Sequence, residues 1–463
     1  MVLSRSPSPD AELDPLALRA LDFFHHSTVL QLARPFLRDL WSRMLTSLMY
    51  HESAIKHGIV SLASLHENFV YATRTTFDDQ RRTTALEHYS KSIQDVVRLN
   101  RKDTNEAVMT TLVSCLLFCA IESIQGHFVS AGKHITAGIN LLFEHEADLL
   151  QRERSARGVP TGFTNALRQL FMGLATQVIG FEESMIDPAL TRYLEAADEV
   201  ANYSFDTLDE ALADVAHLGN YSLRFMTWAE SCQDDPDFPN EALQIAGDKF
   251  QKHYDSWTLA YRNLLVKCSA ENTPMNDSTS LALLILRFNH IVTRIILGMR
   301  FAKGDQISFD PFVEDFRVLV DTAEDLLSTE SRIQSSEGEP ETTFGMSLGI
   351  LPGTFFACIR CRDYEIRHRA LRILKSSRRR ESIWDSRVLS GVAERLIGIE
   401  EKNARTMLGD QIMSYSTQDM PESVRVRELT IDFHGTENCA DVSITEVRKK
   451  HKHVDRFIWE EWQ

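Results

Sequence analysis

The sequence is poor in residues that interrupt folded structure, and it lacks the common signatures of cofactor chemistry. Of its 463 residues only 20 are glycine and 13 are proline, so most of the chain is neither low-complexity nor disordered. No G-x-G-x-x-G, G-x-x-x-x-G-K-[ST], G-x-S-x-G or H-E-x-x-H motif occurs. The seven cysteines are odd in number and irregularly spaced, unlike a secreted disulfide framework. These absences favour a soluble, α-rich intracellular protein.

The chain also lacks an excess of positive charge. Its 50 Lys and Arg against 66 Asp and Glu give a formal charge of −16. This balance argues against a mainly electrostatic nucleic-acid binder, because phosphate contacts need a basic surface. A local basic patch is still compatible with it.

No apolar run approaches the length of a membrane span. The best candidate, residues 281–299, is interrupted by Arg287, Asn289, His290 and Arg294. The N-terminus has no apolar core of the signal-peptide type. We therefore expect no association with a membrane.

Apolar residues at three- and four-residue spacing predict helices through most of the chain. Residues 1–13 are expected to be a disordered leader, 14–402 one large helical domain, and 403–463 a C-terminal extension. Residues 108–121 are apolar on nearly every face, which predicts a central buried helix. The expected helices cover residues 17–32, 35–49, 51–72, 79–97, 108–121, 127–142, 164–180, 208–230, 241–268, 281–302, 311–328 and 346–376.

A period of two replaces the helical period near the C-terminus. Residues 425–433 alternate through Val426, Leu429, Ile431 and Phe433, and residues 440–447 offer a partner strand. The predicted fold class is therefore all-α, a large multi-helix domain with a small β hairpin near the C-terminus.

Two cysteine pairs are candidates for metal or redox chemistry. Cys115 and Cys119 lie four residues apart on the most apolar helix, where an unpaired cysteine behaves as a small hydrophobic residue, so core packing is the favoured interpretation. Cys358 and Cys361 form a single C-x-x-C within a helical pattern. A zinc site there would need distant ligands, for which the candidates are His434, Cys439, His451 and His453.

Acidic pairs raise the alternative of Mg²⁺-dependent chemistry on a diphosphate. The candidates are Asp78 with Asp79, and Asp234 with Asp235 and Asp237. The second group lies in a proline-rich stretch that predicts a loop, and the segment from Asn276 to Ser280 lacks the Glu that a second metal motif requires. Helix caps and solvated loops are the favoured interpretation.

The strongest local excess of positive charge lies in residues 359–380. Its nine basic residues are Arg360, Arg362, Arg367, Arg369, Arg372, Lys375, Arg378, Arg379 and Arg380. A nucleic-acid or nuclear-import role is one interpretation. An apolar stripe at helical spacing runs through the same stretch, however, so we favour arginine stems that cover a core and heads that reach acidic neighbours.

The last ten residues, 454–463, mix aromatic side chains with carboxylates. Such a tail resembles an acidic-hydrophobic activation segment. A terminal strand or helix docked on the protein would show the same composition, so both interpretations stay open.

Four stretches, taken in order, carry a pattern beyond simple helix periodicity. They are residues 20–25 with Trp41; residues 55–67, 85–89 and Ile93; residues 115–122, Gly126, 131–134 and 138–142; and residues 361–385, including Cys361-Arg-Asp, Arg379-Arg-Glu381 and Trp384-Asp385. Over residues 17–400 their order and spacing resemble the large regulatory domain of fungal zinc-cluster transcription factors, the fungal specific transcription factor domain. This resemblance implies an all-helical fold and a regulatory setting.

The chain departs from that family in two places. Members normally begin with a six-cysteine module that binds two zinc ions and reads DNA, but the first cysteine here is Cys115, so the family's zinc ligands carry over to no position. Ser382 stands where the family usually has Gly, which is expected to relax one turn.

Some relatives, such as sterol-uptake regulators, hold an apolar ligand pocket in the helical domain, and the 25 Phe and 13 Met here permit one.

We therefore expect a nuclear transcriptional regulator or co-regulator that senses a small molecule or a partner and controls metabolic or secondary-metabolite genes. Its expected partners are other transcription factors or a second copy, with DNA contacted indirectly and an apolar molecule as the ligand. The alternative is a helical scaffold repurposed as a metal-independent cyclase or isomerase, with Glu122, His134 or Asp363 as acid or base. We assign no catalytic, cofactor-binding or metal-ligating residue and expect no cofactor.

Overall fold

The computed structural model describes the chain in thirteen stretches. They are residues 14–32, 39–71, 79–99, 105–155, 162–179, 202–219 (without 213, 216 and 217), 240–270, 276–299, 305–337, 342–408 (without 348), 414–434, 439–447 and 452–458. The chain forms two compact units, Met1–Phe171 with Glu339–Met346 and Glu460–Gln463, and Met172–Gly338 with Ser347–Trp459. The helical domain predicted over 14–402 is thus divided between two units. The predicted leader and most of the predicted helix over 208–230 lie outside the described residues.

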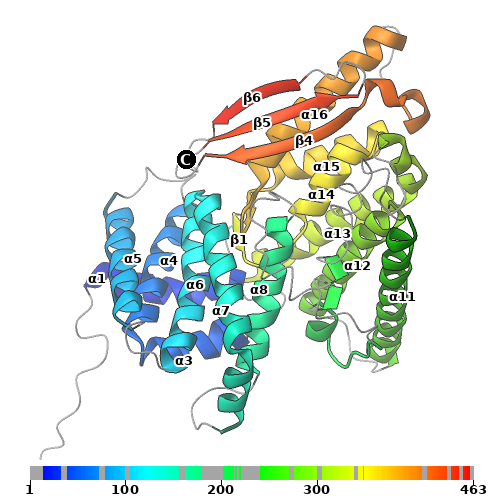
Figure 1. Ribbon diagram of the computed structural model, residues 1–463. Helices are drawn as coiled ribbons and strands as arrows, with labels where there is room; N and C mark the ends of the chain where they lie inside the picture. Colours follow the sequence, from blue (N-terminus) through cyan, green and yellow to red (C-terminus); the bar gives the residue numbers. More distant parts are fainter. Residues whose placement is uncertain are drawn as a thin grey trace, which may run out of the picture. The chain divides into compact units, whose positions relative to one another are not determined.

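The first unit is a set of packed helices, drawn in blue and cyan in Figure 1. They are α1 (Pro15–Phe23), the π-helical turn η1 (Phe24–Thr28), α2 (Val29–Leu32), the π-helical turn η2 (Leu40–Met44), α3 (Leu45–Met49), α4 (Ser53–Tyr71), α5 (Asp79–Leu99), α6 (Asn105–Gln125), α7 (Phe128–Ser155) and the start of α8 (Phe163–Ile179). Helix α4 packs against α5 and α6, and α6 packs against α7. The short strand β1 (Thr343–Gly345) lies beside α2.

Two helices, α6 and α12 (Asp277–Gly298), are long and apolar enough to cross a membrane by length and composition. The expectation that no run reaches this length was therefore wrong. In α6, 83% of the most apolar segment is buried inside the protein, whereas in α12 the buried share of the corresponding segment is 56%. The fully buried Leu112, Leu116 and Cys119 confirm the central buried helix predicted here, because a helix that is apolar all round must be covered on every face.

The second unit holds the other helices and the sheet near the C-terminus. Its elements are α11 (Asn240–Ala270), α12, the 3₁₀ turn η5 (Gln306–Phe312), α13 (Val313–Glu337), α14 (Leu351–Arg360), α15 (Tyr364–Ser376), β2 (Arg379–Glu381), β3 (Trp384–Asp385), α16 (Ser386–Leu408), the 3₁₀ turns η6 (Thr417–Asp419) and η7 (Glu422–Val424), β4 (Val426–Phe433), β5 (Cys439–Glu446) and β6 (Lys452–Ile458). Helices α14, α15 and α16 pack against one another.

Strands β4, β5 and β6 form an antiparallel sheet that lies beside α16 (Figure 1). In the first pair Phe433 lies opposite Ala440 and Val426 opposite Glu446, so the predicted hairpin is confirmed to within one residue at each end. The third strand, β6, contains the start of the predicted acidic-aromatic tail and pairs with β5 from Cys439 to Thr445. The described part of this tail is therefore a docked strand. The fold class is confirmed as α-helical with a small sheet near the C-terminus.

The helix predicted over residues 346–376 is two helices. Backbone at Cys361 is extended and ends α14, and Asp363 begins α15 because its side chain accepts the N–H of Ile366 at 3.1 Å. The periodicity bridged this corner, since apolar residues on both helices face the same core. Helix α16 and the β2–β3 pair had no separate prediction.

Candidate functional site: an apolar cavity in the second unit

A cavity of about 300 Å³ lies within the second unit. Four segments supply most of its walls: the end of α8, one face of α12, the residues leading into and through α14, and β4. The described lining residues are Thr176, Gln177, Val215, Gly219, Asn289, Val292, Thr293, Ile296, Phe309, Gly349, Pro352, Gly353, Phe355, Phe356, Ile359, Arg360, Trp384, Leu429 and Ile431. These described residues are chiefly apolar, and Arg360 has the only ionisable side chain among them.

Helix α12 presents one stripe to the cavity. Asn289, Val292, Thr293 and Ile296 are spaced by three and four residues, which places them on a single face. The helix begins where Asn276 accepts the N–H of Thr279 at 2.7 Å, so the segment that lacked a metal motif is a helix cap, as the sequence predicted. This cap fixes where the stripe begins along the chain.

A carboxylate from the β2 strand holds the start of α14. Glu381 accepts the backbone N–H groups of Ile350 at 3.1 Å and Leu351 at 2.8 Å, two donors that no helical carbonyl can satisfy. Gly349 permits this contact, because a Cβ there would come within 2.1 Å of Glu381. Helix α14 therefore stands in a fixed position at the cavity wall.

Strand β4 contributes its inward face. Leu429 and Ile431 line the cavity, whereas Thr430 between them and Asp432 after them are exposed. This is the alternation that predicted the strand from the sequence. The inward-facing residues of this alternation thus supply apolar surface to the cavity.

The polar groups of the cavity are mostly satisfied within their own helices. Thr176 donates to the carbonyl of Met172 at 3.0 Å, Thr293 to that of Asn289 at 3.0 Å, and the Asn289 amide to that of Ile285 at 2.9 Å. Gln177 differs: its Nε2 donates to Ser347 O at 3.3 Å, but its buried Oε1 has no hydrogen-bond partner among the described residues.

The basic stretch at 359–380 supports the cavity from outside. Arg362 and Arg367 both donate to Glu400, at 2.7 and 2.8 Å, with all three side chains fully buried. Burial raises the pKa of the Glu400 carboxyl, whereas the guanidinium groups of Arg362 and Arg367 lower it. The guanidinium groups have the larger effect and lower this pKa to about 2. Glu400 also accepts the N–H of Val426 at 2.8 Å, so the cluster joins α14, α15, α16 and β4.

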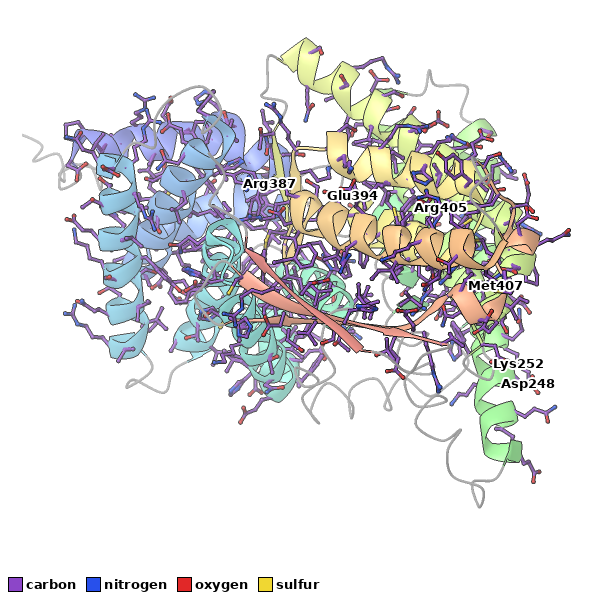
Figure 2. All side chains as sticks on the ribbon, turned by 90° about the horizontal axis from the view of Figure 1, so that it is seen from above. Asp248, Lys252, Arg387, Glu394, Arg405 and Met407 are labelled. Atoms are coloured by element: carbon purple, nitrogen blue, oxygen red, sulfur yellow. The ribbon has the colours of Figure 1, made fainter. Side chains whose placement is uncertain are left out.

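Arg369, Arg379 and Arg380 of this stretch have acidic partners as well. Arg369 binds Asp321 and Glu324, each at 2.6 Å, and Arg380 binds Asp385 at 2.5 Å. Lys375 pairs with Glu394, one of the side chains labelled along α16 in Figure 2, at 2.6 Å. The structural interpretation of this stretch, arginine heads reaching acidic neighbours, is confirmed for these residues.

The cysteine candidates lie in the core. Cys115, Cys119, Cys358 and Cys361 are all buried and form no disulfide, and burial raises the pKa of Cys115 and of Cys361 to about 11, so the thiols of these two stay protonated. The described residues contain no group of three or more His, Cys, Asp or Glu that could hold a metal.

The other proposed zinc ligands have different partners. His434, which directly follows β4, pairs with Asp441 on β5. His453 on β6 pairs with Glu446 on β5. Cys439 is buried on β5, and His451 lies outside the described residues.

Of the acidic residues considered for Mg²⁺ binding, the structure describes only Asp79. Asp79 occupies the first turn of α5, where a carboxylate favours the helix dipole. Asp78, Asp234, Asp235 and Asp237 lie outside the described residues.

The residues considered as acid or base are not at the cavity. Glu122 accepts from the Tyr89 hydroxyl and lies beside His127 Nδ1, each at 2.7 Å, and these hydrogen bonds lower the pKa of Glu122 despite its partial burial. Burial lowers the pKa of the nearby His134. Asp363 caps α15. Glu122 and Asp363 are thus explained by local structural roles.

One expectation about the family pattern was wrong. Ser382, which was expected to relax a turn, has φ of +52°, in the left-handed region that favours glycine. The turn between β2 and β3 therefore still needs the conformation that the family's glycine supplies. Sequence reasoning permitted an apolar pocket but missed its place in the fold and Gln177, because their only signal was the volume left between elements distant in the sequence.

The N-terminal part of the chain is similar to a known protein family. Residues 19–171 match the family model described as the fungal specific transcription factor domain, and the match ends at Phe171, where the main segment of the first unit also ends. The resemblance drawn from the sequence is thereby confirmed for residues 19–171, and the fourth stretch of the pattern, at 361–385, lies outside the match.

A relative spans nearly the whole chain. The aspercryptin biosynthesis cluster-specific transcription regulator atnN of Emericella nidulans is 22% identical over 498 aligned residues, which cover 91% of this chain and 78% of the relative. No solved structure matches. Together the family match and this relative support a role in transcriptional regulation.

Proposed function

We propose that this protein is a nuclear transcriptional regulator of metabolic or secondary-metabolite genes, and that its second unit binds an apolar small molecule in the cavity between α12, α14 and β4. The cavity is the observation that carries the sensing role: its volume of about 300 Å³ and its chiefly apolar walls are typical of small-molecule sites. The regulatory role is supported by the family match over residues 19–171 and by the regulator of Emericella nidulans.

The charges support indirect contact with DNA. The chain carries a formal charge of −16, and the buried or ion-paired arginines of its most basic stretch, such as Arg362, Arg367 and Arg369, are neutralised by Glu and Asp within the protein. Few of these charges are left for phosphate. The chain would reach promoters together with another transcription factor, or as a homodimer that recruits one.

The cavity favours binding over catalysis. The described residues that line it include no Asp, Glu, His, Cys or Lys, so general acid–base work on a bound molecule has no candidate group there. A molecule that binds one packing of α12 against α14 better than another would shift the population toward that packing. A partner that distinguishes the two packings would then report the ligand.

The experiment compares transcripts in the natural host between the wild type, a deletion strain and two single-residue variants. Ile296→Trp places an indole in the cavity, and Leu259→Trp makes a similar change on the exposed side of α11, where Leu259 is 60% exposed. We expect deletion to change a defined gene set, and Ile296→Trp to change the same set at unaltered protein level. Leu259→Trp should match the wild type.

Three results would contradict the proposal. Unchanged transcripts on deletion would remove the regulatory role. Wild-type transcripts with Ile296→Trp, at normal protein level, would remove the sensing role of the cavity. A tagged protein that stays outside the nucleus under every growth condition, or that co-purifies with no promoter DNA after cross-linking, would remove the nuclear role.

A further inference from the structure

We infer that the cavity selects molecules that bring a hydrogen-bond donor, and that Gln177 receives it. This rests on the proposed function, since it concerns the ligand of the same cavity. The class of ligand is then a neutral, largely apolar molecule with a hydroxyl group, rather than a pure hydrocarbon or an ether.

The orientation of the Gln177 amide is fixed by its surroundings. Its NH₂ group faces the carbonyl of Ser347 at 3.3 Å, and a carbonyl can only accept. Nε2 therefore points at Ser347, and Oε1 must point the other way. Gln177 is only 2% exposed, so bulk water does not satisfy this oxygen.

The threonine and asparagine side chains that line the cavity together with Gln177 do not supply the missing proton. The hydroxyl hydrogens of Thr176 and Thr293 already go to carbonyls of their own helices, and the Asn289 amide donates to Ile285. What these hydroxyl groups offer the cavity is oxygen lone pairs. The lining also holds the N–H donors of Arg360 and Trp384, which an acceptor on the ligand can use. A ligand without a donor would still leave the buried Gln177 oxygen unpaired.

The cost of that unpaired acceptor sets the expected selectivity. A buried acceptor without a partner costs about 1–3 kcal/mol, and a ligand hydroxyl that pairs with it recovers part of this. We expect a donor-bearing ligand to bind about five- to tenfold more tightly than an equally apolar ligand that can only accept.

The test uses the full chain and two probes of equal heavy-atom count, 1-octanol and 1-methoxyheptane, with affinities measured by isothermal titration calorimetry. The alcohol can donate and the ether cannot. In the wild type we expect 1-octanol to bind about five- to tenfold more tightly. Gln177→Met, which keeps the side-chain length and removes the acceptor, should bring the two affinities together. Asn68→Leu removes a buried carboxamide that does not line the cavity and should keep the wild-type ratio.

The outcomes separate the two proposals. Equal affinities in the wild type, or a preference that survives in a folded Gln177→Met variant, would overturn the role of Gln177. If both probes bind equally and Ile296→Trp blocks both, the cavity is still a binding site and only the donor selection is wrong. If neither probe binds the wild type, the cavity is not a site for apolar molecules of this size and both proposals fail. The wild-type ratio alone decides the matter should Gln177→Met fail to fold.

Discussion

Arg367 and Glu400 form an ion pair of 2.8 Å in which neither side chain has any exposed surface. Arg362 completes the cluster on the other carboxylate oxygen. One carboxylate faces two guanidinium groups, and Arg367 also donates to the carbonyl of Cys358. Every residue of the cluster is therefore tied to a neighbour in another element, and removing the carboxylate leaves two buried cations without their counter-charge.

Glu400→Gln is expected to destabilise the second unit by about 3–5 kcal/mol, because breaking a buried pair leaves uncompensated charge. The matched control is Glu394→Gln, which removes the partner of Lys375 on the exposed side of α16 and should cost no more than about 1 kcal/mol. Urea unfolding measures both. Similar losses for the two variants would mean that the buried cluster contributes no more than a surface pair.

Acid should remove the contribution of the same carboxylate. The pKa of Glu400 is lowered from 4.5 to about 2 in the folded chain, so the unfolded chain binds the proton first as the pH falls. The stability that Glu400 contributes is complete above about pH 4.5 and is lost as the pH falls toward 2. The difference in unfolding free energy between wild type and Glu400→Gln should therefore shrink over this window. A difference independent of pH would contradict the low pKa.

A second acid effect comes from the first unit. His66 lies between Thr28 and Gln31, at 2.9 and 3.0 Å. Gln31 donates its amide to the carbonyl of Thr342, so its Oε1 faces His66 and accepts from Nε2–H. Nδ1 then accepts from the Thr28 hydroxyl. Such a ring is neutral, in agreement with burial that lowers its pKa from 6.5 to about 3.

Because the folded pKa of His66 lies below the unfolded one, stability is complete above about pH 6.5 and declines as the pH falls toward 3. His66→Gln has no proton to take up, so it should unfold with a shallower dependence on pH in this range, whatever its stability at neutral pH. Thermal unfolding followed at several pH values gives both slopes. Parallel slopes would show that His66 is not held neutral by the fold.

How much of this was visible in the sequence depends on how local each signal is. The helices, the hairpin of β4 and β5, and the acidic partners of the arginines follow from periodicity and from the cost of burying charge. The corner at Cys361 was missed because α14 and α15 bury their apolar faces on one core. Gln177 was missed because an unpaired buried acceptor depends on Ser347, far along the chain, and leaves no local pattern.

The turn at Ser382 offers a stabilising change. Its φ of +52° strains any residue that has a Cβ, and its buried Oγ has no hydrogen-bond partner among the described residues. Ser382→Gly removes both penalties and should stabilise the second unit by about 1 kcal/mol. Ser382→Ala removes only the unsatisfied hydroxyl and should gain less. Urea midpoints for the two variants distinguish the contributions, and a loss of stability with glycine would contradict the strain.

Gly138 and Gly173 make a matched pair on neighbouring helices. A Cβ at Gly138 would lie 2.3 Å from the ring of Phe171, whose side chain is fully buried, whereas a Cβ at Gly173 meets nothing within 4 Å. Gly138→Ala must therefore move a packed ring and is expected to cost about 1–3 kcal/mol. Gly173→Ala should be neutral or gain up to about 1 kcal/mol, since alanine is the better helix former. Urea unfolding of both variants gives the comparison. If both alanines stabilise, the Phe171 ring can move aside without cost, and Gly138, which begins the last segment of the third stretch of the family pattern, would then need a reason other than the close approach of this ring.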